Sequence, residues 1–201
     1  MTARSFRWLF LTLAIGGFAA DQASKYSVFR WLAGNGVGGE YDVIPGWFKL
    51  LAQTDPSAPA CDCAFVKMNG PVPPRVNHGA LFGLGGEKRN VANSFFMGIS
   101  VIAAVAISIW AFRVRTRTDA LLCASLGLIL GGTLGNLFDR AIFGGVRDFL
   151  YFYYIEWPVF NVADCCLVCG AGLLLFQSLF LTPPKEVEAK DSAVVELHQP
   201  I

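Results

Sequence analysis

The sequence predicts an all-α membrane protein with four transmembrane helices and a small extracytoplasmic β element. Of its 201 residues, 54% are hydrophobic and only 15% are charged, whereas charged residues make up about a quarter of a typical soluble domain. Several uncharged runs are long enough to cross a bilayer as helices. The formal net charge of +1 gives no support for nucleic-acid binding, which needs a concentrated basic face.

The first predicted helix covers residues 6–27. Its apolar run follows Arg4 and Arg7 and has the character of a signal peptide's hydrophobic region. Asp21 and Lys25 then follow at a spacing of four, which places them on one face of a continuing helix. Apolar residues resume after this pair, so we favour an uncleaved membrane helix with Asp21 near its outer end. A plain helix salt bridge would explain the same pair and stabilise the helix by only about 0.2–0.5 kcal/mol.

Residues 28–90 are predicted to form an extracytoplasmic loop. The run VIPGWFKLLAQ indicates a strand or a hairpin, and the prolines of PVPPRVNHGALFGLGG exclude a regular helix. Trp47, Phe48 and Phe82 supply aromatic side chains that favour the membrane interface. We therefore expect this loop to carry a small β element that lies on the membrane surface.

Three further apolar runs complete the predicted bundle. They cover residues 91–112, 120–137 and 159–181. Arg113, Arg115 and Arg117 separate the first two runs, which predicts a cytoplasmic connection by the positive-inside rule. Both termini are then cytoplasmic, and the second outer loop covers residues 138–158. We expect residues 1–182 to form a single domain, followed by a disordered cytoplasmic tail at 183–201.

Polar residues from three predicted helices lie at a similar depth. Counted from the cytoplasmic end of each helix at 1.5 Å per residue, Asp21 lies at about 22 Å, Asn136 at about 24 Å and Asp164 at about 26 Å. In a hydrocarbon core about 30 Å thick, all three fall in the outer part of the bilayer. This convergence predicts a single polar site.

The acids near this depth differ in how readily they can be neutralised. Arg140 follows the third helix closely and can neutralise one carboxylate, with Asp139 the nearest candidate. Asp148 and Asp164 are then the acids with no obvious partner. Two carboxylates in a poorly solvated site cannot both ionise cheaply, so such a pair holds one proton. This state suits peptide hydrolysis by an activated water, without a metal, a cofactor or a nucleophilic Ser or Cys.

The same acids are compatible with three competing hypotheses. A structural ion-pair cluster that caps the helix ends would also gather these side chains. A lipid phosphotransferase could use Asp139, Asp148 and Asp164 as Mg²⁺ ligands, and it would lose activity with a chelator. A small transporter fits less well, because the polar residues cluster at one face and do not line a path through the bilayer. Cys166 and Cys169 form a C-x-x-C, but no second pair completes a metal site.

Five short motifs make the pattern more specific. They are DQASK at 21–25, NHGALF at 77–82, GNLFDR at 135–140, GGVRDF at 144–149 and FNVAD at 160–164. With these motifs in this order, the chain resembles the bacterial lipoprotein signal peptidases (signal peptidase II) over residues 6–181. The resemblance implies an aspartic endopeptidase of the cytoplasmic (inner) membrane, with its site near the extracytoplasmic face. It also implies removal of signal peptides from prolipoproteins, by cleavage before a diacylglyceryl-modified cysteine.

The resemblance also assigns roles to residues. It implies that Asp148 and Asp164 are the catalytic dyad. The polar residues that support the site and the substrate backbone would be Asp21, Lys25, Asn77, Asn136, Asp139, Arg140 and Asn161. We expect diacylglyceryl-modified prolipoproteins and membrane lipid as partners, no nucleic acid, no metal or cofactor, and a monomer.

The chain departs from the family pattern at two places. The family usually has N-T-G-A-A-F where this sequence has NHGALF, so His78 stands in place of a Thr. The segment between Trp47 and Asn77 is also longer than usual and contains DPSAPACDC. The dyad motifs are intact, so we expect these changes to affect loop shape and substrate preference rather than the reaction.

Overall fold

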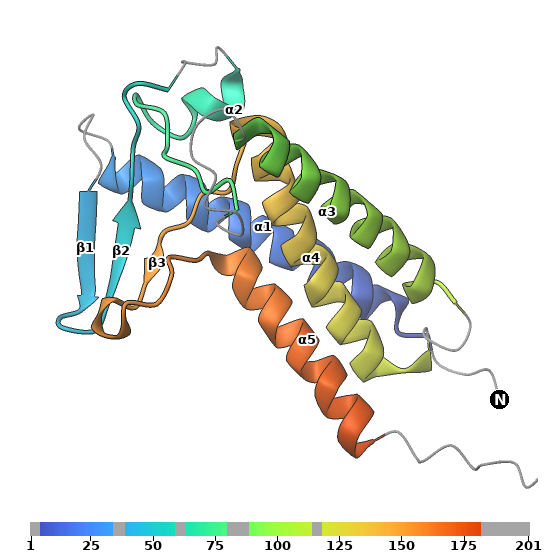
Figure 1. Ribbon diagram of the computed structural model, residues 1–201. Coiled ribbons are helices and arrows are strands. Elements are labelled where there is room, and N and C mark those ends of the chain that lie inside the picture. Colours follow the sequence, from blue (N-terminus) through green and yellow to red (C-terminus); the bar gives the residue numbers. More distant parts are fainter. Residues whose placement is uncertain (1–4, 34–38, 59–62, 80–88, 114–117, 182–201) are drawn as a thin grey trace, which may run out of the picture.

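Four long helices and a small sheet make up the computed structural model, which describes residues 5–33, 39–58, 63–79, 89–113 and 118–181 (Figure 1). The long helices are α1 (Arg7–Leu32), α3 (Arg89–Ala111), α4 (Ala120–Phe143) and α5 (Val162–Phe180). The strands are β1 (Gly39–Ile44), β2 (Phe48–Ala52) and β3 (Leu150–Tyr151), and the short helices are α2 (Ala64–Lys67) and a 3-10 turn (Tyr153–Ile155). Predictions for Phe82, Arg115, Arg117 and the tail at 183–201 lie outside the described residues.

Helix α4 is the centre of the bundle and packs against α1, α3 and α5. Small residues on α4 allow this close approach. A Cβ atom built on Gly135 would lie 2.5 Å from Asp21 Oδ2 on α1 and 3.2 Å from Ala163 Cβ on α5. Glycine at this position therefore lets both neighbouring helices reach α4 at one level, as small residues commonly do between membrane helices.

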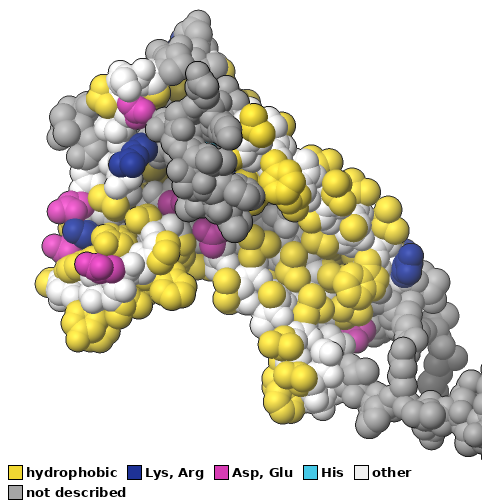
Figure 2. All heavy atoms as spheres, viewed as in Figure 1, with side chains coloured by type: hydrophobic (Ala, Val, Ile, Leu, Met, Phe, Trp, Pro, Cys, Tyr) yellow, Lys and Arg dark blue, Asp and Glu magenta, His cyan; other side chains and the backbone are white. Residues whose placement is uncertain are grey.

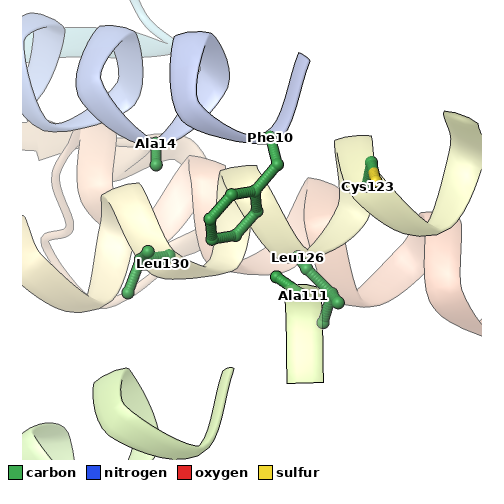
Figure 3. Packing of buried hydrophobic residues seen from close by; sticks show 6 residues of the cluster. All are labelled: Phe10, Ala14, Ala111, Cys123, Leu126 and Leu130. Atoms are coloured by element: carbon green, nitrogen blue, oxygen red, sulfur yellow. The ribbon is translucent and has the colours of Figure 1, made fainter. Parts of the chain in front are cut away.

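The apolar core lies at the end of the bundle away from the sheet. Its buried members come from three helices and are Phe10, Ala14, Ala111, Cys123, Leu126 and Leu130 (Figure 3). A second apolar cluster joins the C-terminal end of α1 to the sheet, through Phe29, Ala52 and Phe149. The polar site described below lies between these two clusters, so apolar packing on both sides holds the helices that carry the site residues.

Three of the described helices are long and apolar enough to cross a membrane, namely Val91–Ala111 of α3, all of α4 and all of α5. Large apolar side chains are exposed along α3 and α5 (Figure 2). Examples on α3 and α5 are Ile102, Ile109, Val168 and Leu179. An apolar outer surface of this extent is typical of helices that face lipid. The mostly helical membrane architecture predicted from the sequence is thus confirmed.

The sheet has the strand order β1-β2-β3, with antiparallel neighbours. The β1–β2 hairpin turns at Gly46, whose φ of 84° lies in the left-handed region that glycine adopts readily. Strand β2 pairs with β3, and Leu150 also pairs with Phe160 just before α5. The predicted hairpin is present, and the sheet holds the connection from α4 to α5 in place.

Two helices extend further than the sequence predicted. Helix α1 continues to Leu32 rather than ending near residue 27, and α4 continues to Phe143 rather than ending near residue 137. Asp139 and Arg140 therefore lie on a helix and not in the loop predicted at 138–158. The prediction ended α4 where charges appear, but Asp139 is fully buried and its charge is neutralised within the fold. A buried, paired charge does not stop a membrane helix.

Candidate active site

The residues predicted to form the site converge at the end of the bundle nearest the sheet. Each is joined by a hydrogen bond or an ion pair to at least one other member of the set. The set is Asp21 and Lys25 on α1, Asn77 between α2 and α3, Asn136, Asp139 and Arg140 on α4, Asp148 between α4 and β3, and Asn161 and Asp164 at the start of α5. Asp21, Asn136 and Asp164, which the depth argument predicted to converge, lie close together: Asn136 bonds to Asp164, and Asp21 bonds to the neighbouring Ala163 amide.

Asp148 is held by two neutral amides. Asn77 Nδ2 donates to its Oδ2 at 3.0 Å, and Asn161 Nδ2 donates to its Oδ1 at 2.7 Å. Asn77 is positioned by backbone hydrogen bonds of 2.7 and 2.9 Å to Val146, two residues before Asp148. Burial raises the pKa of Asp148 to about 6, against the opposing effect of the two amide hydrogen bonds. This carboxyl group therefore takes up a proton far more readily than an exposed aspartate does.

Asp164 occupies the first turn of α5, where it forms a capping box with Asn161. The Asn161 backbone amide donates to Asp164 Oδ2 at 3.1 Å, and the Asp164 backbone amide donates to Asn161 Oδ1 at 3.1 Å. Asn136 Nδ2 donates to the other carboxylate oxygen, Oδ1, at 2.9 Å. Both oxygens thus accept hydrogen bonds at a helix N-terminus, where the helix dipole favours negative charge.

Two other acids belong to a fully buried charge network beside this pair. Lys25 Nζ lies 2.9 Å from Asp21 Oδ2 and 3.2 Å from Asp139 Oδ2, and Arg147 Nη2 lies 2.8 Å from Asp139 Oδ1. All four side chains are 0% exposed. Gln22 joins the network by donating to both carboxylates, at 2.9 and 3.2 Å. Two acids thus face two bases, which is the balance that buried ionic groups require.

Lys25 connects the charge network to the amide-held acids. Its Nζ donates to Asn136 Oδ1 at 3.3 Å, and Asn161 Nδ2 donates to the same oxygen at 3.2 Å. These two donors fix the orientation of the Asn136 amide, so that its Nδ2 points at Asp164. The network therefore orients Asn136 without touching either Asp148 or Asp164 itself.

The prediction that Arg140 neutralises Asp139 is wrong. Asp139 is paired with Arg147 and Lys25, whereas the Arg140 guanidinium lies 5.5 Å from the centre of the Phe96 ring. Arg140 Nη1 donates to the Asn136 carbonyl at 3.4 Å. The reason is geometric, because neighbouring positions on a helix point about 100° apart and do not face each other.

Sequence reasoning missed three residues of the site, namely Gln22, Asn69 and Arg147. Arg147 stands directly before Asp148 in a loop motif, where an arginine is usually solvated. The sequence carried no signal for these residues, because only the structure shows that Asp21 and Asp139 are both buried and share Lys25, which makes a second cation necessary.

The acids are not arranged as a metal site. Among the residues that the structure describes, no group of three or more His, Cys, Asp or Glu side chains is gathered closely enough to hold a metal ion. Asp139, which the phosphotransferase alternative needs as a ligand, is directed at Arg147 and Lys25. The geometry therefore gives this alternative no support.

Comparison with known families decides the identity. The model of the signal peptidase (SPase) II family matches residues 73–180, more than half of the chain. The chain belongs to the signal peptidase II family. It is 37% identical over 184 residues to the lipoprotein signal peptidase of Rhodopirellula baltica, covering 85% of this chain and 71% of that protein. It is 38% identical over 119 residues to the lipoprotein signal peptidase of Pseudoalteromonas translucida, covering 56% of this chain and 69% of that protein.

The fold is also shared with a solved bacterial membrane enzyme. That structure has a TM-score of 0.67 at 23% identity and matches 90% of this chain and 99% of its own. The activity of the signal peptidase II family is the removal of signal peptides from prolipoproteins by an aspartic peptidase of bacterial membranes. The predicted enzyme class, reaction and multi-pass membrane character are thus confirmed.

Proposed function

We propose that Asp148 and Asp164 are the catalytic dyad of this signal peptidase II, which cleaves a prolipoprotein directly before its diacylglyceryl-modified cysteine. One observation carries the assignment. Of the four buried or half-buried acids at the site, Asp21 and Asp139 form ion pairs, whereas Asp148 and Asp164 accept hydrogen bonds from amides. A basic partner keeps a carboxylate ionised, which suits a structural role. A carboxylate that exchanges protons during the reaction must have no such basic partner.

The two acids have different surroundings, which suggests different roles. Asp148 lies half-buried on a loop, and its raised pKa favours the protonated form. Asp164 lies at the N-terminus of α5, where both of its oxygens accept hydrogen bonds that hold the carboxyl group in place to receive a proton. In the reactive state, the dyad thus holds a single proton, on Asp148.

Hydrolysis follows from this starting state. Asp164 takes a proton from a water molecule as the water oxygen bonds to the scissile carbonyl carbon, and Asp148 gives its proton to the carbonyl oxygen. When the tetrahedral intermediate collapses, the carbon–nitrogen bond breaks and Asp164 returns its proton to the leaving amine of the cysteine. Asp148 regains its proton from the same intermediate, so the enzyme ends in its starting protonation state.

The remaining polar residues position the dyad and the substrate. Asn77 and Asn161 hold Asp148, and Asn136 holds Asp164. Arg140 has a different role in this proposal, because its Nε is buried and has no hydrogen-bond partner among the described residues. A carbonyl group of the extended substrate backbone would satisfy this donor, so we assign Arg140 to substrate binding.

Helix α1 forms a fourth membrane span in this proposal. Its polar side chains Asp21, Gln22 and Lys25 are buried against α4 and α5, so they do not face lipid. The outer face of α1 carries apolar side chains such as Trp8 and Ile15, which are 79% and 66% exposed. A helix with neutralised polar groups on its inner face can cross the bilayer.

The orientation we propose has both termini in the cytoplasm and the dyad near the extracytoplasmic face of the inner membrane. Trp47 and Tyr154 stack at the sheet end of the molecule, with ring centroids 4.3 Å apart, and both are more than half exposed. Exposed aromatic pairs of this kind suit the interface between lipid and water. A reporter inserted after Asp55 should read extracytoplasmic and one fused after Arg113 cytoplasmic. Reversed readings would contradict this orientation.

Substrate choice tests the proposed function. The purified enzyme in lipid nanodiscs should cleave a diacylglyceryl-modified prolipoprotein and leave the unmodified precursor intact, with the lipidated cysteine as the new N-terminus by mass spectrometry. EDTA should have no effect, because the dyad chemistry uses no metal. Equal cleavage of both precursors would contradict the proposed specificity, and inhibition by EDTA that Mg²⁺ reverses would favour the phosphotransferase-like arrangement of acids.

A further inference from the structure

The described residues 53–58 and 63–75, here called the insert, are joined at their base and docked on the bundle. The Arg75 backbone amide donates to the Gln53 carbonyl at 2.9 Å, which joins the two ends of the insert. Its short helix α2 lies against α4, where the Phe65 ring meets the Phe138 ring edge-on with 5.5 Å between centroids. The insert therefore has a defined place beside the site.

One polar side chain of the insert reaches into the buried charge network. Asn69 is 1% exposed, and its Oδ1 accepts a hydrogen bond of 2.7 Å from Arg147 Nη1. The other groups of this fully buried guanidinium are directed at Asp139 and Gln22. Without Asn69, Nη1 would lose its acceptor in a place where an unsatisfied charged donor is costly.

Arg147 in turn fixes the loop that carries Asp148, its immediate neighbour in the chain. The Arg147 backbone amide donates to Asp139 Oδ2 at 2.9 Å. Its guanidinium carbon lies 4.0 Å from the centre of the Phe143 ring and 4.3 Å from that of Tyr26. Main chain and side chain are thus both held, so a shift of this guanidinium would move Asp148 relative to its amide donors.

We propose that Asn69 is a positioning residue for the dyad, which holds Arg147 and through it the loop that carries Asp148. The inference rests on the proposed role of Asp148. It makes the insert part of the catalytic scaffold, although none of its described residues belongs to the proposed dyad. Asn69 Nδ2 is buried and has no hydrogen-bond partner among the described residues, so the side chain acts through Oδ1 alone.

Three variants separate this role from general docking of the insert. Asn69→Leu keeps the size of the side chain and removes the acceptor, Asn69→Asp keeps an acceptor oxygen, and Phe65→Ala weakens the docking of α2 without touching Arg147. We expect Asn69→Leu to lower kcat about tenfold at unchanged KM, as expected for a loss of roughly 1.4 kcal/mol. The pH at which activity falls on the alkaline side should also rise, because looser amide contacts stabilise the ionised form of Asp148 less and so raise its pKa. Phe65→Ala should keep kcat within about threefold of the parent, and Asn69→Asp, which keeps an acceptor oxygen, should lose less kcat than Asn69→Leu.

Rates are to be expressed per folded molecule, so that a loss of stability alone moves neither kcat nor the pH limb. The inference would be overturned if Asn69→Leu had the same kcat as the parent and lost activity at the same alkaline pH. It would also be overturned if Phe65→Ala or Asn69→Asp lost as much kcat as Asn69→Leu. Asp148→Asn serves as the reference for the proposed dyad. If Asp148→Asn remains active, the proposed function fails, whereas an inactive Asp148→Asn with a parental Asn69→Leu contradicts only the role of Asn69.

Discussion

Asn161 donates a hydrogen bond of 2.7 Å from its side-chain amide to Asp148. Its backbone amide also donates to Asp164, at 3.1 Å. One residue thus sets the positions of both acids of the proposed dyad. It can do so because it is the N-cap of α5, where the backbone amide and the side chain point out of the helix end together.

The two roles of Asn161 can be separated by substitution. Asn161→Ser keeps an N-cap oxygen but removes the amide that reaches Asp148, so we expect about a tenfold loss of kcat with little change in stability. Asn161→Ala removes both, and we expect it to lose about 1 kcal/mol of stability in addition. Steady-state kinetics and thermal unfolding measure the two effects. Equal kcat for the parent and Asn161→Ser would contradict the positioning role.

The pH dependence of cleavage reports the proton on Asp148. Its pKa of about 6 lies above that of an ordinary aspartate, so the protonated form is present below pH 6 and is lost as pH rises through this value. The profile of kcat/KM should therefore fall on its high-pH side with a midpoint near 6, as an apparent value of the pair.

Asn77→Ala provides the directional test of this profile. Its amide stabilises the ionised form of Asp148, so removal of the amide should raise the pKa and shift the high-pH limb upward. The activity at the optimum should also fall, because Asp148 loses one of its two positioning contacts. If the midpoint pH of the fall in activity stays the same or decreases, Asn77 does not act on Asp148.

The buried charge network is expected to contribute far more to stability than a surface ion pair. Asp139→Asn leaves Arg147 and Lys25 with one carboxylate fewer, and we expect a loss of about 3–5 kcal/mol. Lys49→Met is the matched control, because it breaks the exposed Lys49–Glu40 pair at 2.7 Å and should cost less than about 1 kcal/mol. Thermal unfolding in one detergent compares them. Similar losses in both variants would contradict the account of the network.

Gly135 should tolerate no larger side chain. A methyl group there would lie 2.5 Å from Asp21 Oδ2 and would push α1 away from α4, so Gly135→Ala should destabilise the protein by roughly 1–3 kcal/mol. Gly98→Ala on α3 is the control, since a Cβ there would have no neighbour within 4 Å. We expect it to be neutral or slightly stabilising. If both variants unfold at the parental temperature, the close approach at Gly135 is not required.

Much of the arrangement could be predicted from the sequence, because membrane spans and depth follow from simple lengths. The three most apolar helices were found from their uncharged runs. The gathering of Asp21, Asn136 and Asp164 was found from their distances along each helix. Both arguments depend only on helix rise and bilayer thickness, which vary little between proteins.

The partners of the buried charges could not be predicted in the same way. Arg140 follows Asp139 in the sequence but points elsewhere, and the true partner is Arg147, which a loop folds back onto α4. The extension of α4 to Phe143 was missed for the same reason, since Asp139 looks like a helix end until its partners are known. The contact between Asn69 and Arg147 joins residues far apart in the chain, and no local pattern indicates it.

The central claim is that Asp148 and Asp164 carry the reaction, and single-turnover cleavage of a diacylglyceryl-modified prolipoprotein tests it most directly. The parent is compared with Asp148→Asn, Asp164→Asn and the surface control Asp42→Asn, each shown to be folded by thermal unfolding. We expect each dyad variant to lose at least about 10³-fold in rate while it still binds substrate, and the control to match the parent. Substantial cleavage by either folded dyad variant would contradict the assignment.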